Sequence, residues 1–310
     1  ETGFPSTTDP PGGPRWTRWC ERLVPAFARV TVSSPALEAD FGGRVVRHAR
    51  DERVFDPARY RRDRVRAEFG YTEDDKVILF LGTARAHKGI DKIVRAMRVL
   101  RDPRAALCVV GAGPADPGIR RLDLRADDRV DIFSACRWDQ VPQLMQVADV
   151  VCLLQDEGSA ISLTQFPAKL SDAMAMGVPV IVSGAAPLRE LVALGCAVCC
   201  DEAALPQALR KIFDQRPDRM VAEARDLFLR EFSYAVNRER LQSALSQAST
   251  QPAGHLAGEL LDHLDRSLHD APAADDTEPG VLRPDASGGR PDDERLAPAR
   301  LRSLRRYPRM

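Results

Sequence analysis

Short apolar runs alternate with amphipathic stretches between residues 77 and 214 of this 310-residue chain. The first three apolar runs, Val77–Leu81, Ala105–Val110 and Val130–Phe133, are nearly continuous. Strands that are buried between two layers of helices have continuous apolar sequences, whereas strands with one solvated face alternate apolar and polar residues. The pattern therefore predicts an α/β fold with a doubly wound parallel sheet.

The alternation continues along the chain. Three further strands are predicted at Val150–Leu154, Val178–Val182 and Cys196–Cys200. Helical spacing predicts the intervening helices at Ile90–Leu100, Trp138–Val147, Pro167–Met176, Pro187–Leu194 and Glu202–Phe213. Upstream, strands are expected at Arg29–Ser33 and Val45–His48 with a helix at Pro35–Phe41 between them, and Ser233–Ala248 is predicted to be one more long helix. Ligands of such sheets bind beyond the carboxyl ends of the strands, so the turns there are candidate sites.

Composition narrows the classes of function. Lys plus Arg and Asp plus Glu both number 45, so a net charge of zero gives no general attraction to nucleic acid or anionic membranes. Most of the seven cysteines lie in apolar runs, as expected for reduced, buried thiols of a cytoplasmic protein. No apolar run approaches the roughly 18 residues of a membrane span. An anion site, if present, must therefore be local.

The turn after the first strand, "GTARAHKG", combines glycine with basic residues. Gly82 ends the strand, and the helix that starts near Ile90 directs its free N–H groups and positive dipole end back at the turn. Arg85 and Lys88 add two cations, which makes the turn a candidate phosphate site. A solvated basic turn is the alternative. A second glycine turn, Gly111-Ala-Gly113, follows the next strand and is either a simple tight turn or a place where the backbone approaches a ligand.

The stretch "TQFPAKLSDAMAMGVPVIVS" contains a helix start beside a possible ribose ligand. Pro167 suits the first turn of a helix, and Lys169 and Asp172 lie three residues apart on one helical face. A carboxylate at this edge of the sheet can accept hydrogen bonds from both hydroxyls of a ribose, while the helix N-terminus holds a diphosphate. The alternative is a capping charge with an ion pair between Asp172 and Lys169.

Together these segments resemble the nucleotide-binding half of a GT-B glycosyltransferase of the family 4, group 1 type, which has a Rossmann-like donor domain. The resemblance covers roughly residues 16–248 and is carried by the order and spacing of four segments: "LFLGTARAHKGIDKIVRAM", "CVVGAGP", "VPQLMQVADVVCLL" and "FPAKLSDAMAMGVPVIVSGAAPLRELV".

The resemblance implies roles for individual residues. Lys88 and Arg85 would neutralise the diphosphate of a nucleotide sugar and stabilise charge on the leaving nucleotide. The other donor-binding residues would be Gly82, Thr83, Gly111, Gly113, Phe166, Pro167, Ala168, Lys169 and Asp172, and the base would lie near Ser134–Arg137. Transfer would proceed with retention, without a metal or other cofactor. Two positions depart from the family pattern: Thr83 stands where an arginine is usual, and Thr164 stands in place of the first of two acids, which leaves the contacts to the donor sugar open.

The resemblance also predicts how the chain is divided. We expect a disordered leader at 1–14, a remnant of the acceptor-side domain with the crossing segment at 15–52, the donor domain at 53–232, a crossing helix at 233–250, and a mostly disordered tail at 251–310. The acceptor pocket would lie upstream of this remnant.

Two functions remain open. The chain is either the donor half of a glycosyltransferase acting on a glycan or lipid-linked glycan, or a non-catalytic nucleotide-sugar-binding module or partner subunit that works with a separate acceptor domain. A sugar-nucleotide epimerase would need acid/base carboxylates and histidines in its cleft, and the chain has too few histidines to favour this function. We expect a cytoplasmic location and no nucleic-acid partner. Contact with the cytoplasmic membrane face is the further alternative, and it rests on the six arginines of Arg295–Met310.

Overall fold

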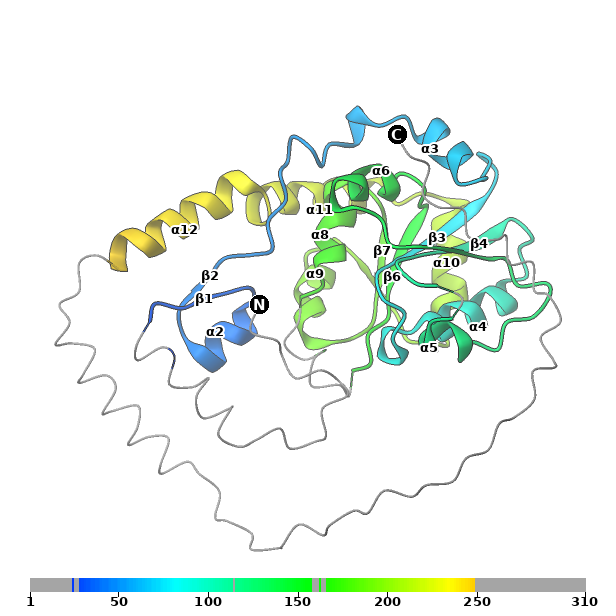
Figure 1. The fold of residues 1–310 in the computed structure, drawn as a ribbon, viewed down its shortest axis with the longest axis horizontal. Helices are drawn as coiled ribbons and strands as arrows, with labels where there is room; N and C mark the ends of the chain where they lie inside the picture. Colours follow the sequence, from blue (N-terminus) through cyan, green and yellow to red (C-terminus); the bar gives the residue numbers. More distant parts are fainter. Residues whose placement is uncertain (1–23, 25–27, 114, 158–161, 163–165, 249–310) are drawn as a thin grey trace, which may run out of the picture.

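Figure 1 shows the computed structural model of the chain, which describes residues 24, 28–113, 115–157, 162 and 166–248. The expectations for residues 1–14 and 251–310 lie outside these residues. In the part that is described, no helix is long and apolar enough to cross a membrane.

The core of the molecule is a six-stranded parallel sheet in the spatial order β5-β4-β3-β6-β7-β8. The strands are β3 (Lys76–Leu81), β4 (Ala105–Val110), β5 (Val130–Phe133), β6 (Val150–Leu153), β7 (Val180–Val182) and β8 (Val198–Cys199). The chain starts in the middle of the sheet, builds one side, and then returns to build the other. This is the strand order of a doubly wound Rossmann-like fold, and the order reverses between β3 and β6.

Helices cover both faces of the sheet (Figure 1). They are α3 (Arg62–Glu68), α4 (Ile90–Leu100), α5 (Pro117–Arg120), α6 (Val141–Met145), α8 (Ala168–Ala175), α9 (Arg189–Ala193), α10 (Leu205–Asp214) and α11 (Asp218–Glu231). Val77 and Leu79 of β3 pack into the core beneath α3, α6, α8, α9 and α11, whereas Ile78 and Phe80 pack into the core beneath α4, α5 and α10. Both faces of the strand are therefore buried, which explains its continuous apolar sequence.

All six predicted strands are present, with small differences at their ends. β7 begins at Val180 rather than Val178, and β8 is limited to the two residues that pair with Ile181 and Val182. The long helix α11 was not predicted. Its sequence is dominated by charged residues, and only a narrow stripe that includes Ala224, Leu227 and Phe228 is buried, so the apolar periodicity is weak.

The segment before the main sheet forms a small unit of its own. β1 (Thr31–Val32) and β2 (Arg44–Val45) pair in parallel, with α2 (Pro35–Phe41) between them. The hydroxyl of Ser34 accepts a hydrogen bond from the Leu37 N–H and caps α2. The predicted helix 35–41 is confirmed, and both strands are shorter than predicted.

The last described helix, α12 (Tyr234–Ala248), runs from the end of α11 back to this unit (Figure 1). Arg44 donates to the Ser243 hydroxyl at 2.8 Å, and the Arg47 N–H donates to Asn237 Oδ1 at 2.8 Å. A bridge between Arg50 and Ser233 joins the two chain segments where they enter the main domain. The segments that cross between the two units are therefore paired with one another.

Candidate functional site

The turns after β3 and β6 meet at the point where the strand order reverses. The Asp156 N–H, beyond β6, donates to the His87 carbonyl at 3.0 Å. Gly89 adopts a left-handed conformation with φ 69°, and a Cβ at this position would lie 2.6 Å from the Leu154 carbonyl oxygen. Only glycine allows both the conformation and this close approach. The turn that begins at Gly82 is thus joined to the β6 side of the sheet.

The basic turn lies, as predicted, between the end of β3 and the start of α4. A single 3-10 turn over Ala86–Lys88 leads directly into α4, whose first residue is Ile90. Lys88 Nζ donates to the Thr83 carbonyl at 3.1 Å, which folds the side chain back over the turn. Arg85 and Thr83 are exposed to solvent. Lys88 is therefore the ordered cation of the turn, and Arg85 is free to reach a ligand.

Lys88 and Lys169 come together over Gly82. A Cβ built on Gly82 would lie 3.8 Å from Lys88 Nζ and 3.6 Å from Lys169 Cε. Among the residues that the structure describes, neither lysine has a carboxylate partner. Burial, together with the charges of Lys169 and Arg85, lowers the pKa of Lys88 to about 8. Unpaired cations that lie this close together form a site suited to an anion.

Gly111 brings the second glycine turn against the first. The residue has φ 104°, and a Cβ here would lie 3.1 Å from the Gly82 backbone. Gly113, by contrast, has open space at its Cβ position. The conformation and packing of Gly111 fit the explanation as a simple tight turn. Of the two glycines, only Gly113 leaves room for a ligand.

The start of α8 holds the third group of predicted residues. Pro167 directly precedes Ala168, the first residue of the helix, and its carbonyl accepts from the Leu170 N–H at 3.0 Å. Phe166 is buried and stacks on Phe232 with ring centroids 5.0 Å apart. The Arg47 guanidinium lies over both rings, at 5.6 and 5.3 Å from their centroids. The stacked rings of Phe166 and Phe232 therefore hold the start of α8 in place. Thr164 lies outside the described residues.

Asp172 does not pair with Lys169, so that alternative is wrong. Its carboxylate accepts a short hydrogen bond from Arg50 Nε, and the side chains of Arg50 and Asp172 are 7% and 1% exposed. Burial raises the pKa of Asp172, while the Arg50 charge opposes this shift. Arg50 was missed by the sequence analysis because nothing near it in the chain indicates a partner 122 residues away.

The loop predicted to hold the base is open to solvent. Ser134, Ala135 and Arg137 are exposed, and Arg137 forms a local ion pair with Asp139 at 2.8 Å. Trp138, which follows them, is 55% exposed and carries the Arg50 guanidinium 4.2 Å from its ring centroid. The Cys136 thiol is half-buried, and burial raises its pKa. This loop therefore borders the Arg50–Asp172 pair.

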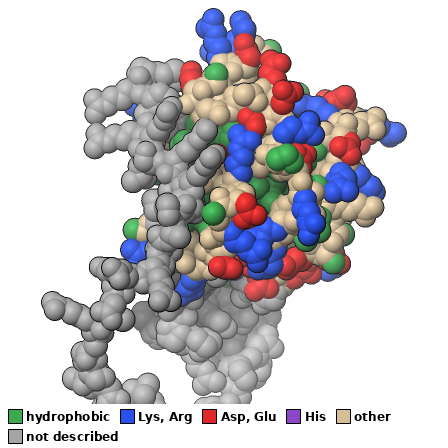
Figure 2. All heavy atoms as spheres, turned by 90° about the vertical axis from the view of Figure 1, so that its right-hand side faces the viewer, with side chains coloured by type: hydrophobic (Ala, Val, Ile, Leu, Met, Phe, Trp, Pro, Cys, Tyr) green, Lys and Arg blue, Asp and Glu red, His purple; other side chains and the backbone are tan. Residues whose placement is uncertain are grey.

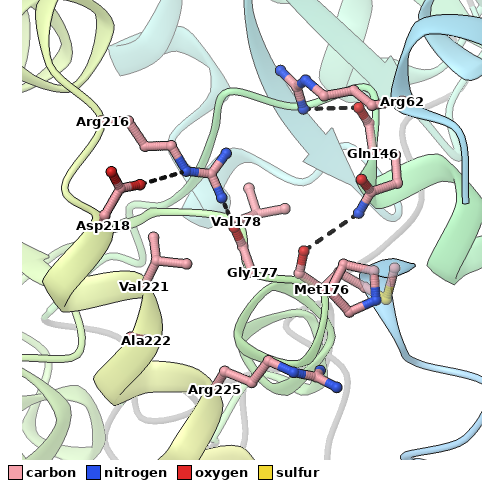
Figure 3. Close-up of a pocket in the computed structure, with 11 residues that line it drawn as sticks. Arg62, Gln146, Met176, Gly177, Val178, Arg216, Asp218, Val221, Ala222 and Arg225 are labelled. Carbon is pink, nitrogen blue, oxygen red and sulfur yellow. Dashed lines mark hydrogen bonds and ion pairs between the residues drawn. The ribbon is translucent and has the colours of Figure 1, made fainter. Parts of the chain in front are cut away.

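The other end of α8 is held by side chains around a cavity of about 260 Å³ (Figure 3). Three successive carbonyls at the end of the helix, those of Ala175, Met176 and Gly177, accept hydrogen bonds from Arg225, Gln146 and Arg216. The carbonyls that a helix terminus leaves unpaired are thereby satisfied. This cavity lies at the opposite edge of the sheet from Lys169, so its arginines fix the helix rather than meet the anion site.

Charge elsewhere on the molecule is mixed. On the face drawn in Figure 2, basic and acidic side chains lie next to one another across the coloured surface. This agrees with the zero net charge of the chain and leaves the lysines at Gly82 as a local feature.

The sequence matches the family model "Glycosyl transferases group 1" over residues 61–226, so the chain belongs to that family. It is 30% identical over 132 residues to an uncharacterized glycosyltransferase of Methanocaldococcus jannaschii, covering 41% of this chain and 32% of the relative. It is 27% identical over 188 residues to a GDP-mannose-dependent monoacylated alpha-(1-6)-phosphatidylinositol monomannoside mannosyltransferase of Corynebacterium glutamicum, covering 58% and 49%. The chain thus spans half or less of the length of these relatives.

Solved structures show the same fold. The HepE protein of Anabaena, in complex with UDP and glucose, superposes with a TM-score of 0.61 at 21% identity, over 74% of this chain and 66% of that one. Sucrose-phosphate synthase of Thermosynechococcus elongatus gives a TM-score of 0.64 at 20% identity, over 79% and 65%. The GT-B, Rossmann-like architecture that the sequence predicted is therefore confirmed.

Proposed function

We propose that the chain binds the diphosphate of a nucleotide sugar where the turns after β3 and β6 meet and supplies the donor half of a retaining glycosyltransferase. The observation that carries this proposal is the convergence of Lys88 and Lys169 over Gly82 without a carboxylate partner among the described residues. The start of α4 adds free N–H groups at the same place. A diphosphate would satisfy both lysines at once.

The chemistry follows from the charge that develops in the reaction. The bond between the anomeric carbon and the diphosphate oxygen breaks, and its electron pair stays on the nucleoside diphosphate. The acceptor hydroxyl oxygen forms the new bond to that carbon, and its proton passes to the leaving diphosphate. Lys88, Lys169 and Arg85 would stabilise the growing negative charge, which is the largest single contribution in reactions of this kind.

The ribose of the nucleotide is assigned to Asp172, and the diphosphate also to the backbone at Phe166–Ala168. The name of one relative specifies GDP-mannose, and HepE was solved with UDP, so guanine and uracil are both candidate bases. A glycan or lipid-linked glycan is the proposed acceptor, at the cytoplasmic face of the membrane or in the cytoplasm, and the acceptor-side contacts would come from outside the donor domain.

Calorimetric titration tests the donor site directly. Wild-type chain and Lys88→Ala are titrated with UDP, GDP, ADP and inorganic pyrophosphate, with Lys92→Ala as the control for loss of one lysine from the neighbouring helix. Saturable binding of one nucleotide that Lys88→Ala abolishes and Lys92→Ala preserves would support the proposal. Binding that survives Lys88→Ala would contradict the assignment of the diphosphate.

A non-catalytic nucleotide-sugar-binding subunit is the second candidate. It is favoured by Thr164, which stands in place of the first of the two acids of the family pattern. The two candidates separate in one assay, since a complete enzyme releases nucleoside diphosphate from the bound donor when acceptor is supplied. Binding without release, restored by a separate acceptor domain, would identify the partner subunit.

A further inference from the structure

The Asp172 carboxylate is held by Arg50, which precedes the donor domain in the chain. Arg50 lies in the crossing segment after β2, whereas Asp172 lies in the second turn of α8. Arg50 Nε donates to Asp172 Oδ1, and both side chains are more than nine-tenths buried. A buried carboxylate can keep its charge only when a buried cation is placed this close.

Arg50 itself is fixed on several sides. Its N–H donates to the Phe232 carbonyl at 2.9 Å, and its carbonyl accepts from the Tyr234 N–H at 2.9 Å. The Nη1 atom donates to the Ala49 carbonyl at 2.9 Å, and the guanidinium lies 4.2 Å from the centroid of the Trp138 ring. Its position is therefore set by both crossing segments and by the loop after β5.

The second carboxylate oxygen of Asp172, Oδ2, is not bonded to Arg50. Oδ2 is enclosed and has no hydrogen-bond partner within the part of the chain that is described. Buried carboxylate oxygens are nearly always satisfied, so an open one indicates a missing donor. The charged or titratable groups around the carboxylate are Arg50, Lys169 and the Cys136 thiol, and Lys169 also belongs to the anion site.

We propose that Arg50 is a positioning residue of the donor site, which holds Oδ1 of Asp172 so that Oδ2 remains the acceptor for a ribose hydroxyl. The proposal rests on the proposed function, because it takes the ligand at Lys88 and Lys169 to be a nucleotide. The ribose is not expected to displace Arg50 from Asp172, since the buried guanidinium would then lose its counter-ion. The ligand instead opens the enclosure around Oδ2 while Arg50 stays in place.

The test compares ligands with and without the hydroxyls. Wild-type chain, Arg50→Gln and Arg50→Lys are titrated with the ribonucleoside diphosphate that binds best, with its 2′,3′-dideoxy analogue and with inorganic pyrophosphate. Arg53→Gln is the matched control, because this arginine is 82% exposed and pairs only with the neighbouring Asp51. Thermal unfolding of each variant is measured in parallel.

We expect Arg50→Gln to weaken binding of the ribonucleotide about tenfold or more, because a displaced Asp172 would lose its charged hydrogen bond to the ribose hydroxyl. Binding of the dideoxy analogue and of pyrophosphate should stay unchanged, and Arg50→Lys should restore part of the loss. Equal losses for all three ligands, or tighter ribonucleotide binding in Arg50→Gln, would overturn the role of Arg50. If Arg50→Gln does not fold, the same contrast between ligands is read from Arg50→Lys. If the wild-type chain binds neither nucleotide nor pyrophosphate, the proposed function itself fails, and this inference with it.

Discussion

Lys88 and Lys169 approach the same glycine from two different turns of the sheet. Lys88 Nζ and Lys169 Cε lie 3.8 and 3.6 Å from the position that a Gly82 Cβ would occupy, and neither lysine has an acidic partner among the described residues. Two like charges placed together at a half-buried position destabilise the fold, and such strain is typical of a site that awaits a ligand of opposite charge. The relationship leads to two predictions.

Replacing Lys88 by glutamine should stabilise the protein in the absence of ligand while destroying the anion site. The substitution removes one of two repelling, partly desolvated charges, and a gain of about 1 kcal/mol would raise the melting temperature by about 2–4 °C. Differential scanning fluorimetry with and without pyrophosphate measures both effects. Lys92→Gln is the control, because Lys92 is a half-buried lysine in the first turn of α4. A fall in melting temperature for Lys88→Gln would contradict the repulsion between the lysines.

Diphosphate binding should weaken as pH rises through about 8, which is the pKa of Lys88. Below this pH the ammonium is charged and attracts the ligand. Above it the empty site holds a neutral amine, so binding must take up a proton. The terminal phosphate of a nucleoside diphosphate, with a pKa of about 6, is already ionised over pH 7.5–9.5, so with this ligand its titration does not mask the effect. Calorimetry in buffers of different ionisation enthalpy measures the proton uptake.

Lys88→Arg provides the control for the pH dependence, because a guanidinium stays charged over the whole range. Its affinity for the same nucleoside diphosphate should be flat between pH 7.5 and 9.5. A wild-type affinity that is equally flat would show that Lys88 is not the titrating cation.

Much of the fold could be predicted because the buried parallel strands have an unmistakable apolar pattern, as in Ala105–Val110. The place of Lys88 beside the start of α4 was predictable too, since the two are neighbours in sequence. The partner of Asp172 was not. Sequence spacing places Lys169 and Asp172 on one face of α8, but the structure directs Lys169 toward Gly82 and buries Asp172 against Arg50. Tertiary packing decides which of these contacts forms, and the spacing of residues within one helix carries no information about that packing.

The two glycines of the second turn should respond differently to alanine. Gly111→Ala puts a Cβ at φ 104° and 3.1 Å from the Gly82 backbone, so we expect a loss of about 1–3 kcal/mol in the free energy of unfolding. Gly113→Ala meets open space and should leave stability within about 0.5 kcal/mol. Urea denaturation measures both. If Gly113→Ala weakens nucleotide binding at unchanged stability, the turn approaches the ligand at Gly113. Equal destabilisation by both variants would contradict this distinction.

Asp149 should be among the acidic side chains most important for stability. It accepts from Arg62 Nη2 at 2.7 Å, from Arg66 Nη1 at 3.1 Å and from the Val77 N–H at 2.7 Å, and Arg66 is 2% exposed. Removal of the carboxylate leaves a buried guanidinium and a strand N–H without their partner at the start of β3. Breaking a buried pair in this way costs about 3–5 kcal/mol.

The measurement is urea denaturation of Asp149→Ala, followed by both fluorescence and circular dichroism. Asp139→Ala is the matched control, because Asp139 pairs with the exposed Arg137 on the surface and should cost at most about 1 kcal/mol. A further comparison separates charge from hydrogen bonding: Asp149→Asn keeps an acceptor for the Val77 N–H but loses the charge that faces Arg62 and Arg66. We expect its stability to lie between those of Asp149→Ala and the wild-type chain. If Asp149→Ala is no less stable than Asp139→Ala, then Arg66 is held by its bonds to the Thr72, Asp75 and Val147 carbonyls alone.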